Sequence, residues 1–141
     1  MRRTSAEVKA LRESVGLSQA DLAELAGVAV RTIKRWERDM TPPDDVCDLL
    51  ERYVVRKAKA VEVALETVDR VTEQAGRAPD LVPLTYFRSQ EEYDALGRDA
   101  GPFGVANANS RAVADALMAR GVSVEFRYPD EGAVRTPGSR Y

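Results

Sequence analysis

Residues 17–38 have the sequence LSQADLAELAGVAVRTIKRWER, and this stretch decides the fold of the amino-terminal part. Ser18 is a favoured N-cap residue, and the apolar positions that follow it have helical spacing as far as Gly27. A second helix follows after a short connection, with Ile33 and Trp36 three positions apart as its inward-facing pair. The pattern predicts a helix-turn-helix, in which the second helix crosses the first and projects from the surface.

The second helix, expected over residues 29–38, is strongly basic. It carries four cations and one carboxylate, for a net charge of +3: Arg31, Lys34, Arg35, Arg38 and Glu37. An arginine can donate two hydrogen bonds to guanine in the major groove, and Val30 can contact a thymine methyl group. Gln19 begins the preceding helix, where free backbone N–H groups can hold a phosphate.

The charge of the whole chain conceals this basic helix. The 141 residues include 21 Lys and Arg against 23 Asp and Glu, which gives a net charge of −2. Residues 1–60 hold 12 basic and 10 acidic side chains, a net of +2, and residues 61–141 hold 9 and 13, a net of −4. A phosphate backbone responds to the nearby patch within a Debye length, so the overall acidity does not exclude nucleic acid.

The segment resembles the Cro/CI (XRE) family of helix-turn-helix proteins, on LSQADLAELAGV at 17–28 and TIKRWER at 32–38. The resemblance implies a lambda-repressor-like helical bundle that binds double-stranded DNA. It implies roles for the following residues: base contacts from Val30, Arg31, Lys34 and Arg35, a phosphate or base contact from Gln19, and a partly buried ion pair between Arg12 and Glu37. Asp39 departs from the family pattern, which usually has glycine after the third helix, and Val30 stands at an often polar position.

Further phosphate contacts are expected around this helix. Thr32 and Arg38 lie on it, and Arg2 and Arg3 form a basic amino-terminal arm that can reach phosphates or the neighbouring minor groove.

The remaining helical signals place a helix on either side of this stretch. Thr4 and Glu7 form a capping box for a first helix that ends at Gly16. Pro43 starts a long helix that continues to about Ala75. Its apolar positions 61, 64, 68, 71 and 75 fit either a short heptad seam or an ordinary packed helix. Cys47 lies on this helix and is expected to be a small, semi-buried hydrophobe.

A smaller α/β unit is expected after the long helix. The predicted elements are a strand over 81–87, a helix from Ser89 to Leu96, a loop over 101–104, a helix capped by Asn109 or Ser110 that ends at Arg120, and a strand over 122–128. Two strands and two helices bury little surface, so this β-α-α-β unit is expected to dimerise. The interface could instead be the long helix.

The expected fold is therefore mainly α, with four segments. They are a DNA-binding domain at 1–58, a linker helix at 59–76, a dimerisation domain at 77–128 and a flexible tail at 129–141. More loosely, this arrangement resembles two-part regulators of the anti-CRISPR-associated repressor type. It predicts a homodimeric, sequence-specific repressor, most simply of its own gene, bound to an inverted-repeat operator.

Composition excludes most catalytic sites. The chain has no histidine and one cysteine, so histidine-based triads, Cys-His pairs and common zinc sites are ruled out. We expect no enzyme activity, no metal and no cofactor. The lone cysteine, the absence of a signal peptide and the absence of an apolar span favour a cytoplasmic protein that does not enter membranes.

Two alternatives for the function remain open. Gly101 and Gly104 have the spacing of the GxxG loop with which some RNA-binding modules clamp nucleotides, although Pro102 and Phe103 between them supply no cation. The protein could also be an antitoxin, in which another segment neutralises a toxin.

Overall fold

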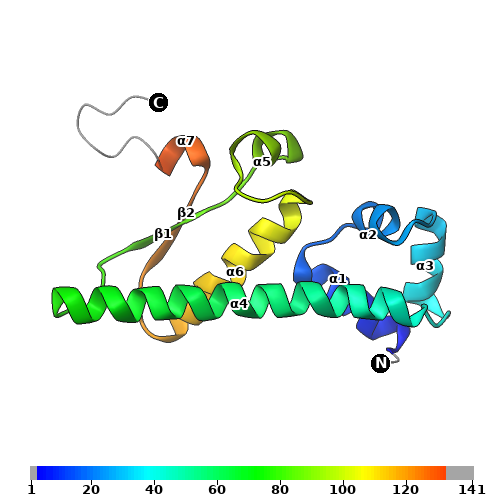
Figure 1. The fold of residues 1–141 in the computed structure, drawn as a ribbon, viewed down its shortest axis with the longest axis horizontal. Coiled ribbons are helices and arrows are strands. Elements are labelled where there is room, and N and C mark those ends of the chain that lie inside the picture. The colour runs from blue at the N-terminus through cyan, green and yellow to red at the C-terminus, as the bar shows by residue number, and fades with distance from the viewer. Residues whose placement is uncertain (1–2, 133–141) are drawn as a thin grey trace. The chain divides into compact units, whose positions relative to one another are not determined.

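The computed structural model describes residues 3–132 and is mainly helical (Figure 1). The chain divides into two compact units, Met1–Ala58 and Lys59–Tyr141. In chain order the elements are α1 (Ser5–Val15), α2 (Gln19–Ala26), α3 (Val30–Arg38), α4 (Asp44–Ala75), β1 (Val82–Thr85), α5 (Gln90–Leu96), α6 (Phe103–Ala119), β2 (Val124–Arg127) and α7 (Pro129–Gly132). The predicted fold class is confirmed in its amino-terminal bundle, its long helix and its small sheet-containing unit.

Local capping explains the short helices of the first unit. Thr4 and Glu7 close a capping box on α1, and Ser18 and Asp21 close another on α2. Both helices end at glycines in the left-handed conformation, Gly16 at φ 85° and Gly27 at φ 71°. Because side chains are strained at such angles, these glycines fix where each helix stops and allow α3 to turn against α1 and α2.

The core of the first unit is formed by the inward faces of all four helices. The side chains of Ile33 and Trp36 on α3 are 0% and 5% exposed, and the start of α4 adds Leu50 at 0%. Cys47 is also buried, and burial raises the pKa of its thiol. The cysteine is therefore an apolar core residue. Because the raised pKa keeps its thiol protonated, it is also a weak nucleophile.

The second unit is built on a two-stranded parallel sheet. Val82 pairs with Val124 and Thr85 with Arg127, and the crossover between the strands contains α5 and α6. The core consists of Val68, Val113, Leu117 and Val122, with Val61, Ala64, Leu65, Val82, Leu84 and Val124 packed against it. Three of the five heptad positions of α4 thus lie in this core, as expected for an ordinary packed helix.

Two predictions about this unit were wrong. Helix α6 begins at Phe103 rather than near Asn109 or Ser110, because the backbone N–H of Phe103 is capped by the side chain of Gln90. Gly104 consequently lies within α6, so residues 101–104 do not form the free loop that a GxxG clamp needs.

The end of the second unit also differs from expectation. Helix α7 occupies the first four residues of the segment predicted as a tail, and residues 133–141 lie outside the described residues. Within residues 3–132, no helix has both the length and the apolar character needed to cross a membrane.

Candidate nucleic-acid interface

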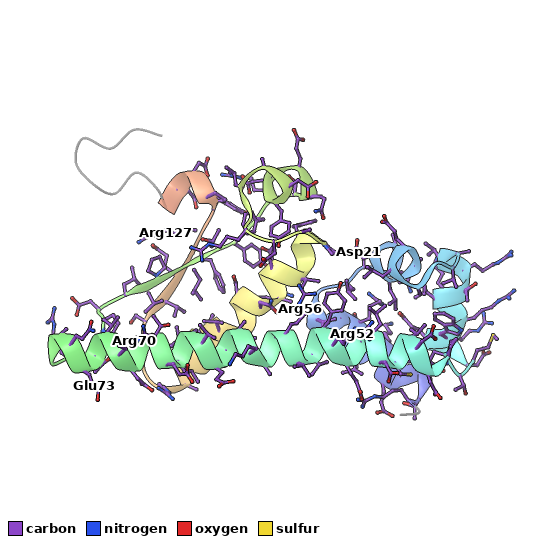
Figure 2. All side chains as sticks on the ribbon, in the orientation of Figure 1. Asp21, Arg52, Arg56, Arg70, Glu73 and Arg127 are labelled. Carbon is purple, nitrogen blue, oxygen red and sulfur yellow. The ribbon has the colours of Figure 1, made fainter. Side chains whose placement is uncertain are left out.

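Helix α3 presents a basic face to solvent. Its buried residues are Ile33 and Trp36, and the opposite face exposes Val30, Arg31, Lys34, Arg35 and Arg38. Figure 2 shows side chains of α3 extending outward with nitrogen atoms at their tips. Helix α3 therefore brings together the four predicted base-contacting residues and two of the predicted phosphate contacts, Thr32 and Arg38.

Three of the cations on this face have no partner among residues 3–132. Arg31, Lys34 and Arg35 form no hydrogen bond or ion pair with any residue in the part of the chain that the structure describes. Arg38 contacts the carboxylate of Asp39 at 3.1 Å, but this pair is highly exposed and contributes little to stability. The unpaired cations are available to an anionic ligand without breaking an internal contact.

The amino end of α3 adds uncommitted hydrogen-bond donors. Its N-cap residue is Ala29, which has no side chain to cap the helix, and the N–H groups of Val30 and Arg31 donate to no described residue. Thr32 is half-buried in the same turn. This end of the helix can therefore offer backbone donors and partial positive charge to a phosphate.

An ion pair beneath this surface holds α3 in place. The Nε of Arg12 donates to Oε2 of Glu37 at 2.5 Å, and its Nη2 donates to Oε1 at 3.0 Å. The Arg12 and Glu37 side chains are 10% and 4% exposed. Arg12 also donates to the Leu17 carbonyl at 2.9 Å, so one guanidinium joins α1, the α1–α2 connection and α3.

The structure adds Gln19 to this ion pair. Its Nε2 donates to Oε1 of Glu37 at 3.3 Å, a contact between α2 and α3 that sequence analysis missed. Burial raises the pKa of the Glu37 carboxyl, but hydrogen bonds from Arg12 and Gln19 lower it by more, so the net pKa is below its ordinary value. A helical pattern within one element contains no signal for such a contact between elements.

The predicted amino-terminal arm is not free at Arg3. Its guanidinium donates to Glu51 at 2.6 Å and to Glu7 at 3.4 Å, and the first of these bonds raises its pKa most. Arg3 is thus held against α4 and α1 rather than extended. Arg2 lies outside the described residues.

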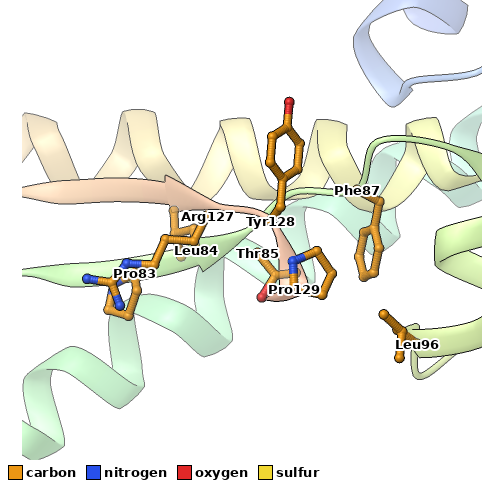
Figure 3. Close-up of a pocket in the computed structure, with 8 residues that line it drawn as sticks. All are labelled: Pro83, Leu84, Thr85, Phe87, Leu96, Arg127, Tyr128 and Pro129. Atoms are coloured by element: carbon orange, nitrogen blue, oxygen red, sulfur yellow. The ribbon is translucent and has the colours of Figure 1, made fainter. Parts of the chain in front are cut away.

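The second unit contains a pocket with no uncommitted charge on its lining. The pocket, of about 350 Å³, lies against β1 and the end of β2, and Arg127 is its one charged lining residue (Figure 3). Arg127 donates to Glu125. The pocket therefore gives no indication of an ionic ligand.

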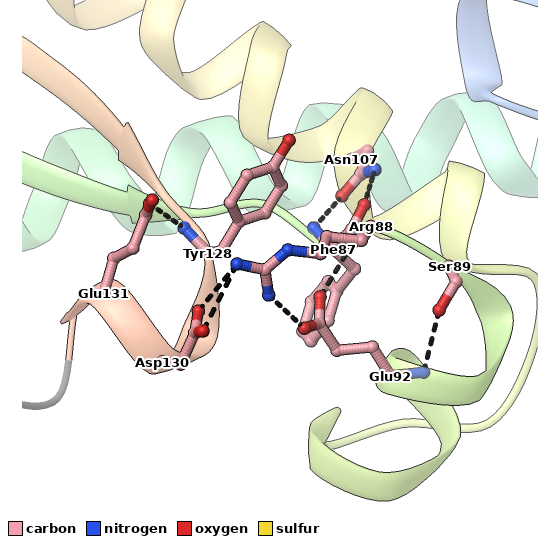
Figure 4. Close-up of polar contacts among 8 residues, drawn as sticks. All are labelled: Phe87, Arg88, Ser89, Glu92, Asn107, Tyr128, Asp130 and Glu131. Atoms are coloured by element: carbon pink, nitrogen blue, oxygen red, sulfur yellow. Dashed lines mark hydrogen bonds and ion pairs between the residues drawn. The ribbon is translucent and has the colours of Figure 1, made fainter.

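Polar contacts at the end of the sheet are structural (Figure 4). Arg88 donates to Glu92 at 2.6 Å and to Asp130 at 3.0 Å, and its guanidinium lies 4.0 Å from the centre of the Tyr128 ring. These contacts join the segment after β1 to α5 and α7. The Arg88 guanidinium is the shared partner of both the Glu92 and the Asp130 carboxylates.

The geometry of the first unit and the comparison with known families both indicate a helix-turn-helix. Residues 8–53 match the family described as helix-turn-helix, and the matched segment lies entirely within the first unit. It contains α2, α3, the Arg12–Glu37 pair and the basic face. No curated protein matches the chain.

Residues 8–53 are therefore a helix-turn-helix domain of the Cro/CI (XRE) type, which is a DNA-binding fold. The predicted family is confirmed for this segment. This segment supports a role in DNA binding of the kind that XRE-type transcription regulators perform.

Proposed function

We propose that the protein is a homodimeric transcriptional repressor that acts in the cytoplasm, most simply on its own promoter. The observation that carries the proposal is the exposed face of α3, on which Arg31, Lys34 and Arg35 have no partner among residues 3–132. Burying an ion without compensation is costly, whereas these side chains can move from water to DNA without losing an internal partner.

The proposed mode of binding places α3 in the major groove. Arg31, Lys34 and Arg35 donate to base edges, and Val30 contacts a thymine methyl group. Gln19, Thr32 and Arg38 contact the phosphates on either side of the groove and set the register of the helix. We leave Arg3 out of this contact set, because two carboxylates hold it.

The proposed operator is an inverted repeat. A two-fold dimer presents two copies of α3, and these reach the same face of the duplex when their half-sites are about one turn, ~34 Å, apart. Occupation of such a site within a promoter excludes the transcription machinery.

A library selection tests the operator directly. Random duplexes bound by the full chain are selected at a stated salt concentration, because phosphate contacts make affinity depend on salt. An inverted repeat is the expected product. Selection of single, unpaired half-sites would contradict the symmetric dimer, and recovery of no preferred sequence would contradict specific binding.

Replacing Arg35 by alanine tests the role of α3. The variant Arg35→Ala should bind the selected operator more weakly by about 1–3 kcal/mol and lose preference at one base pair. The measurement is a binding titration against the operator and its single-base variants. Arg70→Ala is the matched control, because Arg70 is exposed on α4 in the second unit. Equal affinity and preference for Arg35→Ala and the parent would refute the assignment of α3.

A further inference from the structure

The two edges of the small sheet differ in whether their outward N–H and carbonyl groups already form hydrogen bonds. We propose that the free edge of β2 is the homodimer interface, where β2 pairs antiparallel with β2 of a second copy around Phe126. This inference rests on the proposed homodimer and specifies the surface that forms it. The resulting sheet would have four strands, with β1 of each copy at its outer edges.

The hydrogen bonds between the strands show which groups face outward. Val82 donates to Ser123 and Tyr86 donates to Arg127, both at 2.9 Å. In a parallel ladder, alternate residues bond to the neighbouring strand. The backbone groups of Pro83, Thr85 and Phe87 therefore point away from β2, and those of Val124 and Phe126 point away from β1.

The free edge of β1 is closed to a further strand. Pro83 has no N–H group. The Thr85 carbonyl accepts a hydrogen bond from Ser110 at 2.8 Å. The side chain of Asn107 accepts from the Phe87 N–H at 2.8 Å and donates to the Phe87 carbonyl at 2.9 Å (Figure 4). Helix α6 thus satisfies this edge where a neighbouring strand would otherwise bind.

The free edge of β2 is open by comparison. The outward N–H and carbonyl groups of Val124 and Phe126 form no hydrogen bond within residues 3–132. Phe126 is 44% exposed, and its ring lies 5.4 Å from that of Tyr86 in an edge-on contact. An unpaired edge with an exposed aromatic side chain is a template for another strand.

Charge complementarity identifies a second copy of β2 as that strand. In an antiparallel pair centred on Phe126, Glu125 faces Arg127 of the second copy, and Arg127 faces Glu125 of the second copy. Opposite charges directly across a strand pair are stabilising, and like charges are destabilising. Pairs centred on Glu125 or on Arg127 place identical charges opposite each other. The sequence of β2 is therefore self-complementary in one register.

The backbone groups fit the same register. Phe126 and its copy exchange two hydrogen bonds at the centre. The Val124 N–H meets the Tyr128 carbonyl of the second copy, which already accepts from the Glu131 N–H at 3.0 Å but retains a second lone pair. The Tyr128 N–H donates to the Glu131 carboxylate at 2.9 Å, so Glu131 must release it before it can donate to the Val124 carbonyl of the second copy. The exposed faces of Phe126 and Tyr128 become covered in the pair.

Charge reversals in the full chain test this register. Glu125→Arg and Arg127→Glu each create two like-charge contacts per dimer, so each variant should dimerise about tenfold more weakly or worse in sedimentation equilibrium. The double variant should recover the parent affinity. An equal mixture of the two single variants should also dimerise like the parent, because each chain then faces opposite charges. Recovery on mixing shows that the single variants are folded.

Two control variants test whether dimerisation depends on another surface. Glu91→Arg makes the same charge change on an exposed position of α5 and should leave dimerisation unchanged. Val55→Arg tests α4, where Val55 is 66% exposed, and should also have no effect. If Val55→Arg dissociates the dimer, or if both β2 reversals leave it intact, the β2 interface is wrong while the homodimer stands. A monomeric parent chain overturns both.

Cross-linking gives a second measurement. In the proposed register the two Phe126 Cα atoms lie about 5.5 Å apart, so a short bifunctional thiol reagent can bridge cysteines at this position. Treatment of Phe126→Cys with such a reagent should give a covalent dimer, and Leu96→Cys, exposed elsewhere on the same unit, should not. The native Cys47 is 1% exposed and does not compete. Failure of Phe126→Cys to cross-link in a dimeric chain overturns the register.

Discussion

At the scale of single residues, Glu37 on α3 connects this helix to both α1 and α2. Its carboxylate accepts hydrogen bonds from Arg12 and Gln19 while its side chain is 4% exposed. Removing one partner of a buried pair leaves the other charge without compensation. The same contacts that orient α3 therefore make the unit sensitive to substitution and to acid.

The variant Glu37→Gln should be less stable than the parent by about 3 kcal/mol at neutral pH, because the Arg12 charge remains buried. Urea unfolding followed by fluorescence measures this loss, since Trp36 is the single tryptophan and lies in the first unit. The double variant Arg12→Leu with Glu37→Leu should recover part of the stability, because it removes both charges. A single variant as stable as the parent would contradict the role given to the pair.

The same pair predicts a pH dependence. The pKa of Glu37 in the folded protein is below its ordinary value of 4.5, so the pair contributes full stability above about that pH. This stability is lost as the pH falls through the folded pKa. The difference in unfolding free energy between parent and Glu37→Gln should therefore shrink below about pH 4.5, and a difference that grows in acid would contradict this sign.

At the scale of elements, helix α6 acts on the sheet through Asn107. This side chain is 4% exposed and closes the edge beyond β1 with two hydrogen bonds to the Phe87 backbone. A covered edge cannot recruit a further strand, so α6 restricts pairing to β2. Asn107 therefore affects both the stability of the unit and which edge of its sheet is available to a further strand.

Asn107→Ala should destabilise the second unit by about 1–3 kcal/mol, because it leaves two backbone groups of Phe87 unpaired. Hydrogen exchange provides the measurement. We expect faster exchange than in the parent at β1 and α6, and an unchanged exchange rate at α1–α3. Asn109→Ala is the matched control, since Asn109 is half-buried on the same helix and its side chain makes no hydrogen bond to residues 3–132. Equal effects of the two changes would contradict the clamp.

The elements of the first unit could be predicted from the sequence because their signals are local. Capping boxes, terminal glycines and helical spacing lie within each helix, and their predicted bounds agree with the structure to within a residue or two. The start of α6 could not be predicted in this way. Asn109 and Ser110 resemble caps, but Ser110 bonds to Thr85, 25 positions away. Such a tertiary contact leaves no local pattern.

In the candidate site, too, local features could be predicted from the sequence and contacts between elements could not. The basic face of α3 follows directly from helical spacing around Ile33 and Trp36. The Arg12–Glu37 contact came from the family resemblance, and the Gln19 contact was missed because it joins two helices. The restraint on Arg3 also depends on α4, through Glu51, and has no signal near the amino terminus.

At the scale of the whole molecule, the proposed base contacts and the proposed dimer interface lie in different units. The first unit contains the matched helix-turn-helix segment, and the second contains the proposed β2 interface. Each unit has its own buried residues, so changes in one can leave the other folded.

Deletion of residues 77–141 should test this separation. The first unit should remain folded, because its buried residues all precede the deletion, while residues 61–68 of α4 lose their core partners on α6 and β2. The product should be monomeric by light scattering and should bind an inverted repeat at least tenfold more weakly. A dimeric product would move the interface to α4, and undiminished binding would show that dimerisation does not assist it.

The parallel pairing of β1 with β2 has a consequence for the order of events during synthesis. Val82 cannot pair with Val124 until the whole α5–α6 crossover has left the ribosome, whereas the contacts of α1–α3 close within a short stretch of chain. The first unit should therefore fold while the second is still being made. If the proposed function holds, a truncated product of translation would carry a folded α3 but no β2. It would therefore remain monomeric and compete poorly with the proposed dimer for an operator.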